Sequence, residues 1–259
     1  MFKFIFIILG YLIFGFFGAF LGYLIGSSID RAKSYGLGGV NPLSNAHRKA
    51  VFLETAFVLM GKLAKADGHI SKDEVEHVEQ FIKKMSMSPE HRKLAIEQFK
   101  RGSVADFDIN TTLDEFMASC GHTSNLKQVL LMYLTVMALA DGKLDPAERE
   151  LLEKIALRLN YSIAEFNQML DMVLNQSHFA HGGGTQSASA LEDAYKALGV
   201  TKENSDQEIK RAYRKLMSQY HPDKLIGQGL PEDMIAVATE QAKEIQVAYD
   251  LIKKHRKNI

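Results

Sequence analysis

The sequence predicts an all-α fold made of a single N-terminal transmembrane helix, a duplicated helical-bundle domain and a C-terminal helical hairpin. Three observations support this prediction. An uncharged run lies near the N-terminus, a helical pattern in the middle of the chain recurs at a constant offset, and two segments near the C-terminus have apolar residues at helical spacing. The expected boundaries are an anchor at 1–30, a connector at 31–46, the repeat domain at 47–176, a Gly/Ser linker at 177–190 and the hairpin domain at 191–259.

Composition narrows the classes of function. The 259 residues include 31 basic and 31 acidic side chains, so the formal net charge is zero. A nucleic-acid binder depends on a basic footprint, and the balance of charge therefore argues against a nucleic-acid partner. Cys120 is the one cysteine of the sequence, which excludes an intramolecular disulfide and a multi-cysteine zinc site and fits a reducing compartment.

The uncharged run from Phe4 to Ile29 is long enough to cross a lipid bilayer. As a helix it would extend about 39 Å, against a hydrocarbon core of about 30 Å. The apolar region of a cleaved signal peptide is shorter, roughly 7–15 residues, so the run predicts an uncleaved anchor. Because more basic residues follow the run than precede it, the N-terminus is expected outside the cytoplasm and the C-terminal domains inside it. The basic residues that follow are Arg31, Lys33, Arg48 and Lys49.

Gly18, Gly22 and Gly26 recur at every fourth position and form a stripe of small residues on one face of this expected helix. A second helix could approach closely along such a stripe, so the spacing predicts a homodimer through the transmembrane segment. The alternative is that glycine is simply frequent in membrane-spanning helices.

The middle of the chain contains an internal repeat. The segments 64-AKADGHISKDEVEHVEQF-81 and 138-ALADGKLDPAERELLEKI-155 share a pattern in which position 64 aligns with position 138. The same offset also places Ser88 on Ser162, and each serine is a plausible N-cap of the next helix. This self-similarity predicts a duplicated helical unit.

The acidic residues of the repeat have two interpretations. Ser71 with Glu74, and Asp145 with Glu148, have the spacing of capping boxes at helix starts. The alternative is a shared site for a hard cation, with Asp67 and Asp141 joining the two glutamates as oxygen ligands. Neither loop has the repeated Asp/Asn spacing of a calcium-binding EF-hand, so capping is favoured and no metal or other cofactor is expected.

The pattern A-D-G-x-[IL]-x-x-x-E between helices resembles the TerB-like, or tellurite-resistance-type, helical domain over about residues 47–176. The resemblance implies an interaction or scaffold module more readily than an enzyme. The segment 177-SHFAHGGGTQSASA-190 that follows is expected to be a flexible linker. His178 and His181 lie close together in it but lack the further ligands of a metal site.

Residues 191–259 return to helical patterning in three pieces. Helices are expected over 191–198, over 206–220 and from Pro231 onward, with a loop at 221–230. The last two helices would form an antiparallel hairpin. The helix before the loop also carries a group of basic residues, here called the basic flank, which consists of Lys210, Arg211, Arg214 and Lys215.

The tripeptide His221-Pro222-Asp223 lies at the tip of this hairpin. Proline stiffens the turn, which would hold the Asp223 carboxylate outward beside the basic flank. A carboxylate accepts a bidentate guanidinium contact and a basic flank attracts an acidic surface, so the arrangement predicts a protein partner. His221 has no paired nucleophile in the sequence pattern, and a catalytic role is therefore not expected.

The short first helix, the basic second helix, the His-Pro-Asp tripeptide and the long third helix together resemble a J-domain over residues 191–259. The resemblance implies that the protein binds a DnaK-class chaperone and stimulates its ATP hydrolysis without being an enzyme itself. It makes His221, Pro222 and Asp223 essential and gives the basic flank a docking role. The sequence has no Gly/Phe-rich region after this domain and no CxxC repeat, which argues against client binding of the usual J-protein kind.

The whole arrangement resembles the DjlA family of J-domain co-chaperones. This resemblance implies a single-pass type III protein of the bacterial inner membrane, with a periplasmic N-terminus and cytoplasmic domains, associated with capsular polysaccharide signalling. The middle domain would then select a client that the sequence does not identify. A competing hypothesis makes the protein a membrane-anchored helical scaffold that responds to metal or stress.

Overall fold

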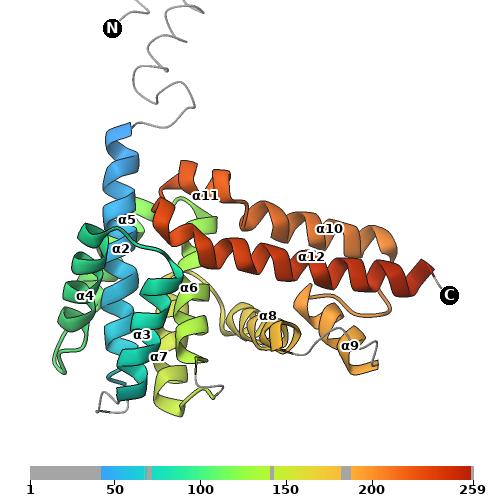
Figure 1. Ribbon diagram of the computed structural model, residues 1–259, viewed down its shortest axis with the longest axis horizontal. Helices are drawn as coiled ribbons and strands as arrows, with labels where there is room; N and C mark the ends of the chain where they lie inside the picture. Colours follow the sequence, from blue (N-terminus) through green and yellow to red (C-terminus); the bar gives the residue numbers. More distant parts are fainter. Residues whose placement is uncertain (1–41, 67, 69–71, 141–142, 182–187, 258–259) are drawn as a thin grey trace, which may run out of the picture. The chain divides into compact units, whose positions relative to one another are not determined.

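The computed structural model describes residues 42–66, 68, 72–140, 143–181 and 188–257 (Figure 1). The chain divides into two compact units, residues 1–48 and 49–259. In the first unit the described residues form the beginning of α2 (Pro42–Leu63). The second unit contains the rest of α2 followed by α3 (Lys72–Lys84), α4 (Pro89–Gly102), α5 (Asn110–Cys120), α6 (Ser124–Ala138), α7 (Pro146–Arg158), α8 (Ile163–His181), α9 (Ala188–Ala197), α10 (Asp206–Gln219), α11 (Pro222–Gln228), the 3-10 helix η1 (Glu232–Met234) and α12 (Ile235–Lys257). Within this unit we call residues 49–181 the middle bundle and residues 188–257 the C-terminal bundle.

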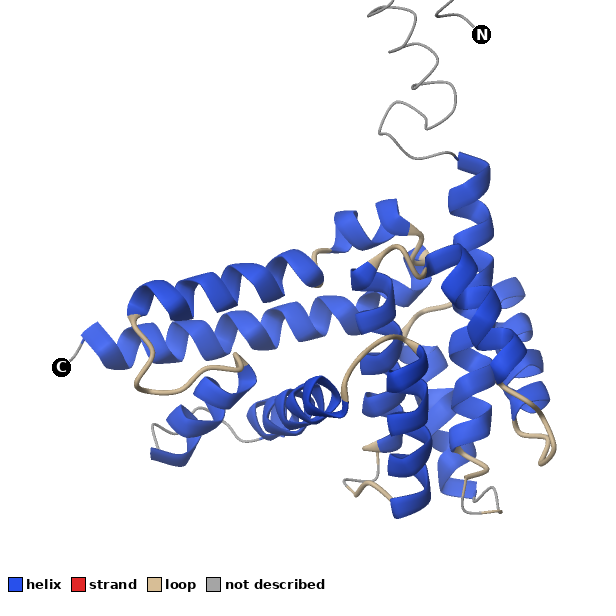
Figure 2. Ribbon diagram, turned by 180° about the vertical axis from the view of Figure 1, so that it is seen from behind, coloured by secondary structure: helices blue, strands red, loops and turns tan. Residues whose placement is uncertain are grey.

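All described elements are helices, and the ranges given above contain no strand (Figure 2). The all-α prediction is therefore confirmed. The expected anchor at 1–30, with Gly18, Gly22 and Gly26, lies outside the described residues. Of the helices that the structure does describe, none combines the length and the apolar character needed to cross a bilayer.

The helices of the middle bundle repeat at the offset that the sequence predicts. α3 begins at 72 and ends at 84, while α7 begins at 146 and ends at 158, so both ends are shifted by the offset that aligns position 64 with position 138. The helices that follow, α4 and α8, begin at 89 and 163. Just before them, Ser86 and Asn160 both have a left-handed backbone, with φ of +50° and +65°. Residues other than glycine rarely adopt this conformation, so its presence in both copies confirms a duplicated unit.

Capping is confirmed at three of the predicted helix starts. Asp145 Oδ1 accepts a hydrogen bond from the backbone N–H of Ala147 at 2.7 Å, and Glu148 Oε2 accepts one from the N–H of Asp145 at 3.1 Å. The hydroxyl oxygens of Ser88 and Ser162 accept backbone N–H groups at the starts of α4 and α8. In the second copy the Glu148 carboxylate therefore serves the helix terminus.

The predicted capping box of the first copy falls outside the described part of the chain. Ser71, Asp67 and Asp141 are not described, and neither is the side chain of Glu74. Over the residues that are described, no group of three His, Cys, Asp or Glu side chains is placed to hold a metal ion.

Aromatic rings form the centre of the middle bundle. Tyr133 of α6 packs edge-on against Phe52 of α2, with 6.1 Å between ring centroids, and against Phe81 of α3 at 5.8 Å. Phe116 of α5 packs against Phe52 as well, at 6.1 Å. Such pairs add about 0.5–1.5 kcal/mol each beyond the burial of their area. Four helices of the bundle are thus joined through one group of rings.

In the C-terminal bundle α10 and α12 lie side by side and antiparallel, and α9 packs against α12 (Figure 1). Tyr213 of α10 stacks on Tyr249 of α12, with ring centroids 4.1 Å apart and planes 12° from parallel. Of the apolar positions that the helical periodicity predicts, Ala212, Tyr213, Ile235 and Tyr249 are half-buried. The others are buried: Ile209, Leu216, Tyr220, Ala238, Ala242, Ile245 and Ile252. The predicted hairpin is therefore present.

Two predicted connections contain helix. α8 continues to His181 and α9 begins at Ala188, so helix occupies both ends of the expected linker at 177–190. The prediction of a loop at 221–230 was wrong, because α11 lies within it. Pro222 suits the first position of a helix, where its missing N–H has no partner to lose. Gly229, with φ of +117°, then ends the helix in the left-handed conformation that glycine tolerates.

Two glycines allow α2 and α4 to cross closely. A Cβ atom added to Gly61 would lie 2.0 Å from the carbonyl oxygen of Phe99, and one added to Gly102 would lie 1.9 Å from that of Val58. In both cases the neighbour is backbone, which cannot move aside without shifting its helix.

We predict that Gly61→Ala and Gly102→Ala each destabilise the protein by about 1–3 kcal/mol, because overpacking outweighs the better helix propensity of alanine. Gly227→Ala in α11 is the control, since a Cβ there meets nothing within 4 Å. It should be neutral or stabilising by up to about 1 kcal/mol. Urea unfolding of the full chain, followed by circular dichroism, measures all three. Equal effects at the three positions would contradict the close crossing.

Candidate functional site

The tripeptide His221-Pro222-Asp223 lies at the junction of α10 and α11. His221 is the N-cap of α11, with φ of −65° and ψ of 122°, and its side chain makes no capping hydrogen bond. Pro222 occupies the first helical turn, and Asp223 follows it. The side chains of His221 and Asp223 are exposed, and neither is joined by a hydrogen bond or ion pair to another described residue. Both are therefore accessible to a partner.

Buried residues hold the backbone on both sides of the tripeptide. Tyr220, which precedes it, is 4% exposed, and Leu225, which follows it, is fully buried. The Tyr220 hydroxyl oxygen accepts a hydrogen bond from Nε2 of Gln128 in α6 at 3.2 Å. Lys224 Nζ donates to Oγ of Ser218 at 2.9 Å, across the turn from α11 to α10. The tripeptide is thus a short exposed stretch between two fixed points.

The basic flank lies on the exposed side of α10. All four of its residues are exposed, and none forms an ion pair with another described residue. Lys215 lies near enough to α8 to help lower the pKa of Glu165, although the hydrogen bonds from Ser162 are the larger cause. The flank therefore presents cationic groups to solvent on the helix that leads into the tripeptide.

A capping box that the sequence analysis missed fixes the start of α10. The N–H of Ser205 donates to Oε2 of Glu208 at 2.7 Å, and the N–H of Glu208 donates to Oγ of Ser205 at 3.3 Å. The Ser-x-x-Glu spacing is the signal that could have found it. The contact between Gln128 and Tyr220 has no such signal, because the two residues are 92 positions apart.

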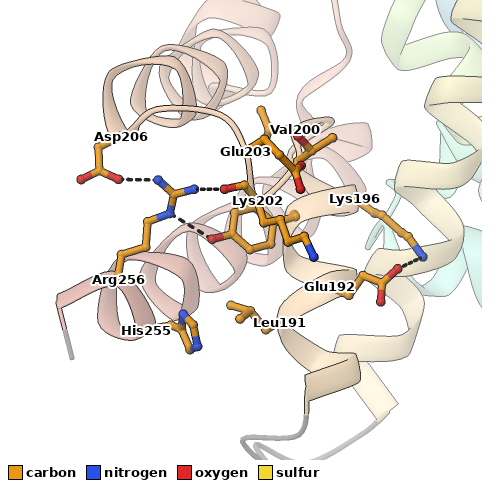
Figure 3. Close-up of a pocket in the computed structure, with 11 residues that line it drawn as sticks. Leu191, Glu192, Lys196, Val200, Lys202, Glu203, Asp206, His255 and Arg256 are labelled. Carbon is orange, nitrogen blue, oxygen red and sulfur yellow. Dashed lines mark hydrogen bonds and ion pairs between the residues drawn. The ribbon is translucent and has the colours of Figure 1, made fainter. Parts of the chain in front are cut away.

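A pocket lies at the other end of the C-terminal bundle, between α9, the start of α10 and the end of α12 (Figure 3). Arg256 crosses it and donates to the Tyr195 hydroxyl at 3.0 Å, to Oδ1 of Asp206 at 2.8 Å, and to the carbonyl oxygens of Lys202 and Asn204 at 2.8 Å each. These bonds tie the loop between α9 and α10 to α12. The guanidinium of Arg256 therefore has a structural role there.

Comparison with known proteins shows the family to which the chain belongs. Residues 53–171 match the family model described as tellurite resistance protein TerB, and residues 193–258 match the DnaJ domain. The co-chaperone protein DjlA of Pasteurella multocida is 35% identical to this chain over 97% of it and 96% of its own length. The chain belongs to the DjlA family of co-chaperones. The DjlA of Haemophilus influenzae is 36% identical over the same shares, and that of Aliivibrio fischeri is 37% identical over 90% of this chain and 89% of its own length.

Membership of the DjlA family confirms the resemblances that the sequence motifs carried. The TerB match lies within the middle segment and the DnaJ match lies within the C-terminal segment. The tripeptide and the whole basic flank fall inside the DnaJ match. No solved structure matches this chain.

We predict a specific pH dependence for the support of the tripeptide. Burial raises the pKa of Tyr220 to about 12, partly offset by the hydrogen bond from Gln128. A tyrosine in the unfolded chain has a pKa of about 10. The folded state therefore holds the hydroxyl proton of Tyr220 more tightly than the unfolded state does. The stability that this difference contributes is complete below about pH 10 and is lost as the pH rises toward about 12.

The variant Tyr220→Phe isolates this effect. At pH 8 it should be less stable than the wild type by about 1 kcal/mol, because the hydrogen bond from Gln128 is lost. The gap should narrow between about pH 10 and pH 12, since the wild type alone can ionise at this position. Urea unfolding at pH 8 and at pH 11 measures it. A gap that is the same at both values would contradict the raised pKa.

Proposed function

We propose that this protein is a membrane-tethered co-chaperone that binds a DnaK-class chaperone through its C-terminal bundle and stimulates the ATP hydrolysis of that chaperone. The observation that carries the proposal is the exposure of His221 and Asp223, whose side chains form no hydrogen bond or ion pair with another described residue, just after the helix that carries the four exposed cations of the basic flank. Membership of a co-chaperone family and the DnaJ match over 193–258 support it.

The chemistry of docking follows from the two signs of charge. The Asp223 carboxylate can accept a bidentate contact from an arginine of the partner. The basic flank attracts an acidic surface and steers the encounter, and this attraction weakens as salt screens it. His221 has no described nucleophile in contact with it, so its role in the proposal is recognition, and the hydrolysis takes place on the partner.

The proposal predicts the outcome of single-turnover ATP hydrolysis by a purified DnaK-class chaperone with and without the full chain. His221→Gln and Asp223→Asn should each reduce the stimulation by about tenfold or more, because central polar contacts dominate docking energy. Substitutions that remove the charges of Arg211 and Arg214 should weaken the stimulation of ATP hydrolysis and make it less sensitive to salt.

The matched control is the double variant Lys253→Ala with Lys254→Ala, which removes two exposed cations from the far end of α12. It should stimulate like the wild type, since rim charges contribute little. If the wild type gives no stimulation, or if the control loses as much as the tripeptide variants, the proposed function is wrong.

We further propose that residues 1–30 anchor the protein in the bacterial inner membrane, with the N-terminus periplasmic and the C-terminal domains cytoplasmic. The uncharged run and the basic residues after it support this topology. Tethering would raise the effective concentration of the co-chaperone for clients at the membrane surface. The stripe Gly18, Gly22, Gly26 would join two such anchors as a homodimer, and regulation of capsular polysaccharide signalling is the pathway that the family resemblance suggests.

The topology predicts a fractionation result. The full chain should stay with the membrane after a carbonate wash, and deletion of residues 1–30 should release it, because the uncharged run from Phe4 to Ile29 supplies the insertion energy. Protease added to inside-out vesicles should degrade the C-terminal domains, whereas protease added to spheroplasts should leave them intact. Degradation in spheroplasts would show the opposite orientation.

A further inference from the structure

The segment that carries the tripeptide is bonded to the middle bundle as well as to its own bundle. Before the tripeptide, Gln128 of α6 donates to the hydroxyl of Tyr220 at 3.2 Å. After it, the hydroxyl of Tyr133, also on α6, donates to the backbone carbonyl of Met234. One helix of the middle bundle therefore binds the chain on both sides of the exposed stretch.

The apolar side chains that follow the tripeptide are also held in place by burial. Leu225, Leu230 and Met234, which follow the tripeptide, are all fully buried. α11 contacts α6 as well as α10 and α12, so part of this burial is against the middle bundle. A buried apolar side chain that is removed from its pocket loses the favourable free energy of its transfer out of water. The position of α11 is consequently stabilised by a surface outside the C-terminal bundle.

Tyr133 connects the two bundles directly. Its ring is fully buried and packs edge-on against Phe52 and Phe81, so the middle bundle fixes its position. Its hydroxyl needs a hydrogen-bond partner, because a buried hydroxyl without one destabilises the fold. The partner is the carbonyl of Met234, the residue just before α12. Movement of α12 away from α6 would break this bond.

Acidic residues of η1 and α12 pair with side chains of the middle bundle at the edge of the contact. His91 Nδ1 lies 2.5 Å from Oδ2 of Asp233, and Lys49 Nζ lies 3.1 Å from Oε1 of Glu232. Lys84 of α3 pairs with Glu240 of α12. Partly exposed pairs of this kind contribute little stability individually, so their effect is on alignment more than on stability.

The contact leaves the docking side of the tripeptide uncovered. His221 and Asp223 are exposed in the same arrangement that buries Tyr220 and Leu225. The basic flank is also exposed. Contact with the middle bundle is thus compatible with chaperone binding.

We propose that the TerB-like middle bundle positions the His-Pro-Asp tripeptide for the chaperone, with Gln128 and Tyr133 as positioning residues. The inference rests on the proposed co-chaperone function. It gives the middle bundle a second role in that function, positioning of the tripeptide, which is separate from client selection. The two residues touch the C-terminal bundle and hold the tripeptide in its docking geometry. When these two side chains are removed, a smaller fraction of the molecules holds the tripeptide in its docking geometry. The apparent affinity for the chaperone falls in proportion to that fraction.

The experiment measures stimulation of single-turnover ATP hydrolysis as a function of the concentration of the full chain. Gln128→Leu and Tyr133→Phe should each raise the half-maximal concentration by about three- to tenfold, while maximal stimulation stays near the wild-type value. Gln128→Glu should behave like the wild type, because a carboxylate can accept the proton of the Tyr220 hydroxyl. This rescue distinguishes positioning from a general loss of packing.

The matched control is Thr135→Val, which also lies on α6 and is fully buried. Its hydroxyl donates to the carbonyl of Leu131 in the same helix, so the substitution removes a buried hydrogen bond that lies within α6. It should leave the half-maximal concentration unchanged. Urea unfolding of each variant shows whether the losses of stability are comparable.

The outcomes separate this inference from the proposed function. If the wild type does not stimulate the chaperone, the proposed function itself fails. If the wild type stimulates and Gln128→Leu and Tyr133→Phe behave like Thr135→Val, positioning by the middle bundle is overturned. Stronger stimulation by these two variants would also overturn it, since the contact would then restrain the tripeptide.

Discussion

The ring of Tyr133 belongs to the middle bundle, and its hydroxyl proton is donated to the C-terminal bundle. The ring packs among Phe52 and Phe81, while the hydroxyl donates to the carbonyl of Met234. Burial raises the pKa of this tyrosine, so the group stays a neutral donor at physiological pH. An unpaired hydroxyl in such a core is costly, and the two bundles therefore share a core at this point. The arrangement of α11, the tripeptide and the beginning of α12 depends on this shared contact.

Two groups of side chains around the tripeptide differ in their chemistry. On the side of α6 the contacts are apolar or made by neutral hydrogen-bonding groups, such as the Gln128 amide and the Tyr220 hydroxyl. The Asp223 carboxylate and the basic flank, in contrast, are charged and exposed to solvent. Neutral contacts are insensitive to salt, whereas the charged groups respond to it. Salt can thus weaken docking to an external partner, together with the ion pairs at the edge of the internal contact, while the neutral contacts with α6 persist.

The sequence predicted the features that have local signals. Periodicity located α10 and α12, the constant offset of the repeat located the duplicated helices, and the Asp145-x-x-Glu148 spacing predicted its capping box. The tripeptide was found for the same reason, because its three residues are adjacent. α11 was missed because its proline and glycine are also typical of turns. The hydrogen bonds and ion pairs between the bundles were missed because their partners are 91 to 183 residues apart. Periodicity shows which face of a helix is buried, but it does not show what covers that face.

The repeat in the middle bundle gives its backbone an approximate internal symmetry, and the side chains break that symmetry. At the repeat offset, Tyr133 and Gln128 of the second copy correspond to Leu59 and Glu54 of the first. Leu59 is fully buried and has no polar group, and Glu54 pairs with Arg101 at 2.5 Å inside the same bundle. The first copy therefore lacks, at these two positions, the donors that the C-terminal bundle uses. A domain with full internal symmetry would present two equivalent binding surfaces to a neighbour. Because these two positions differ between the copies, only the second copy presents both donors, and the duplication did not create a second equivalent attachment site.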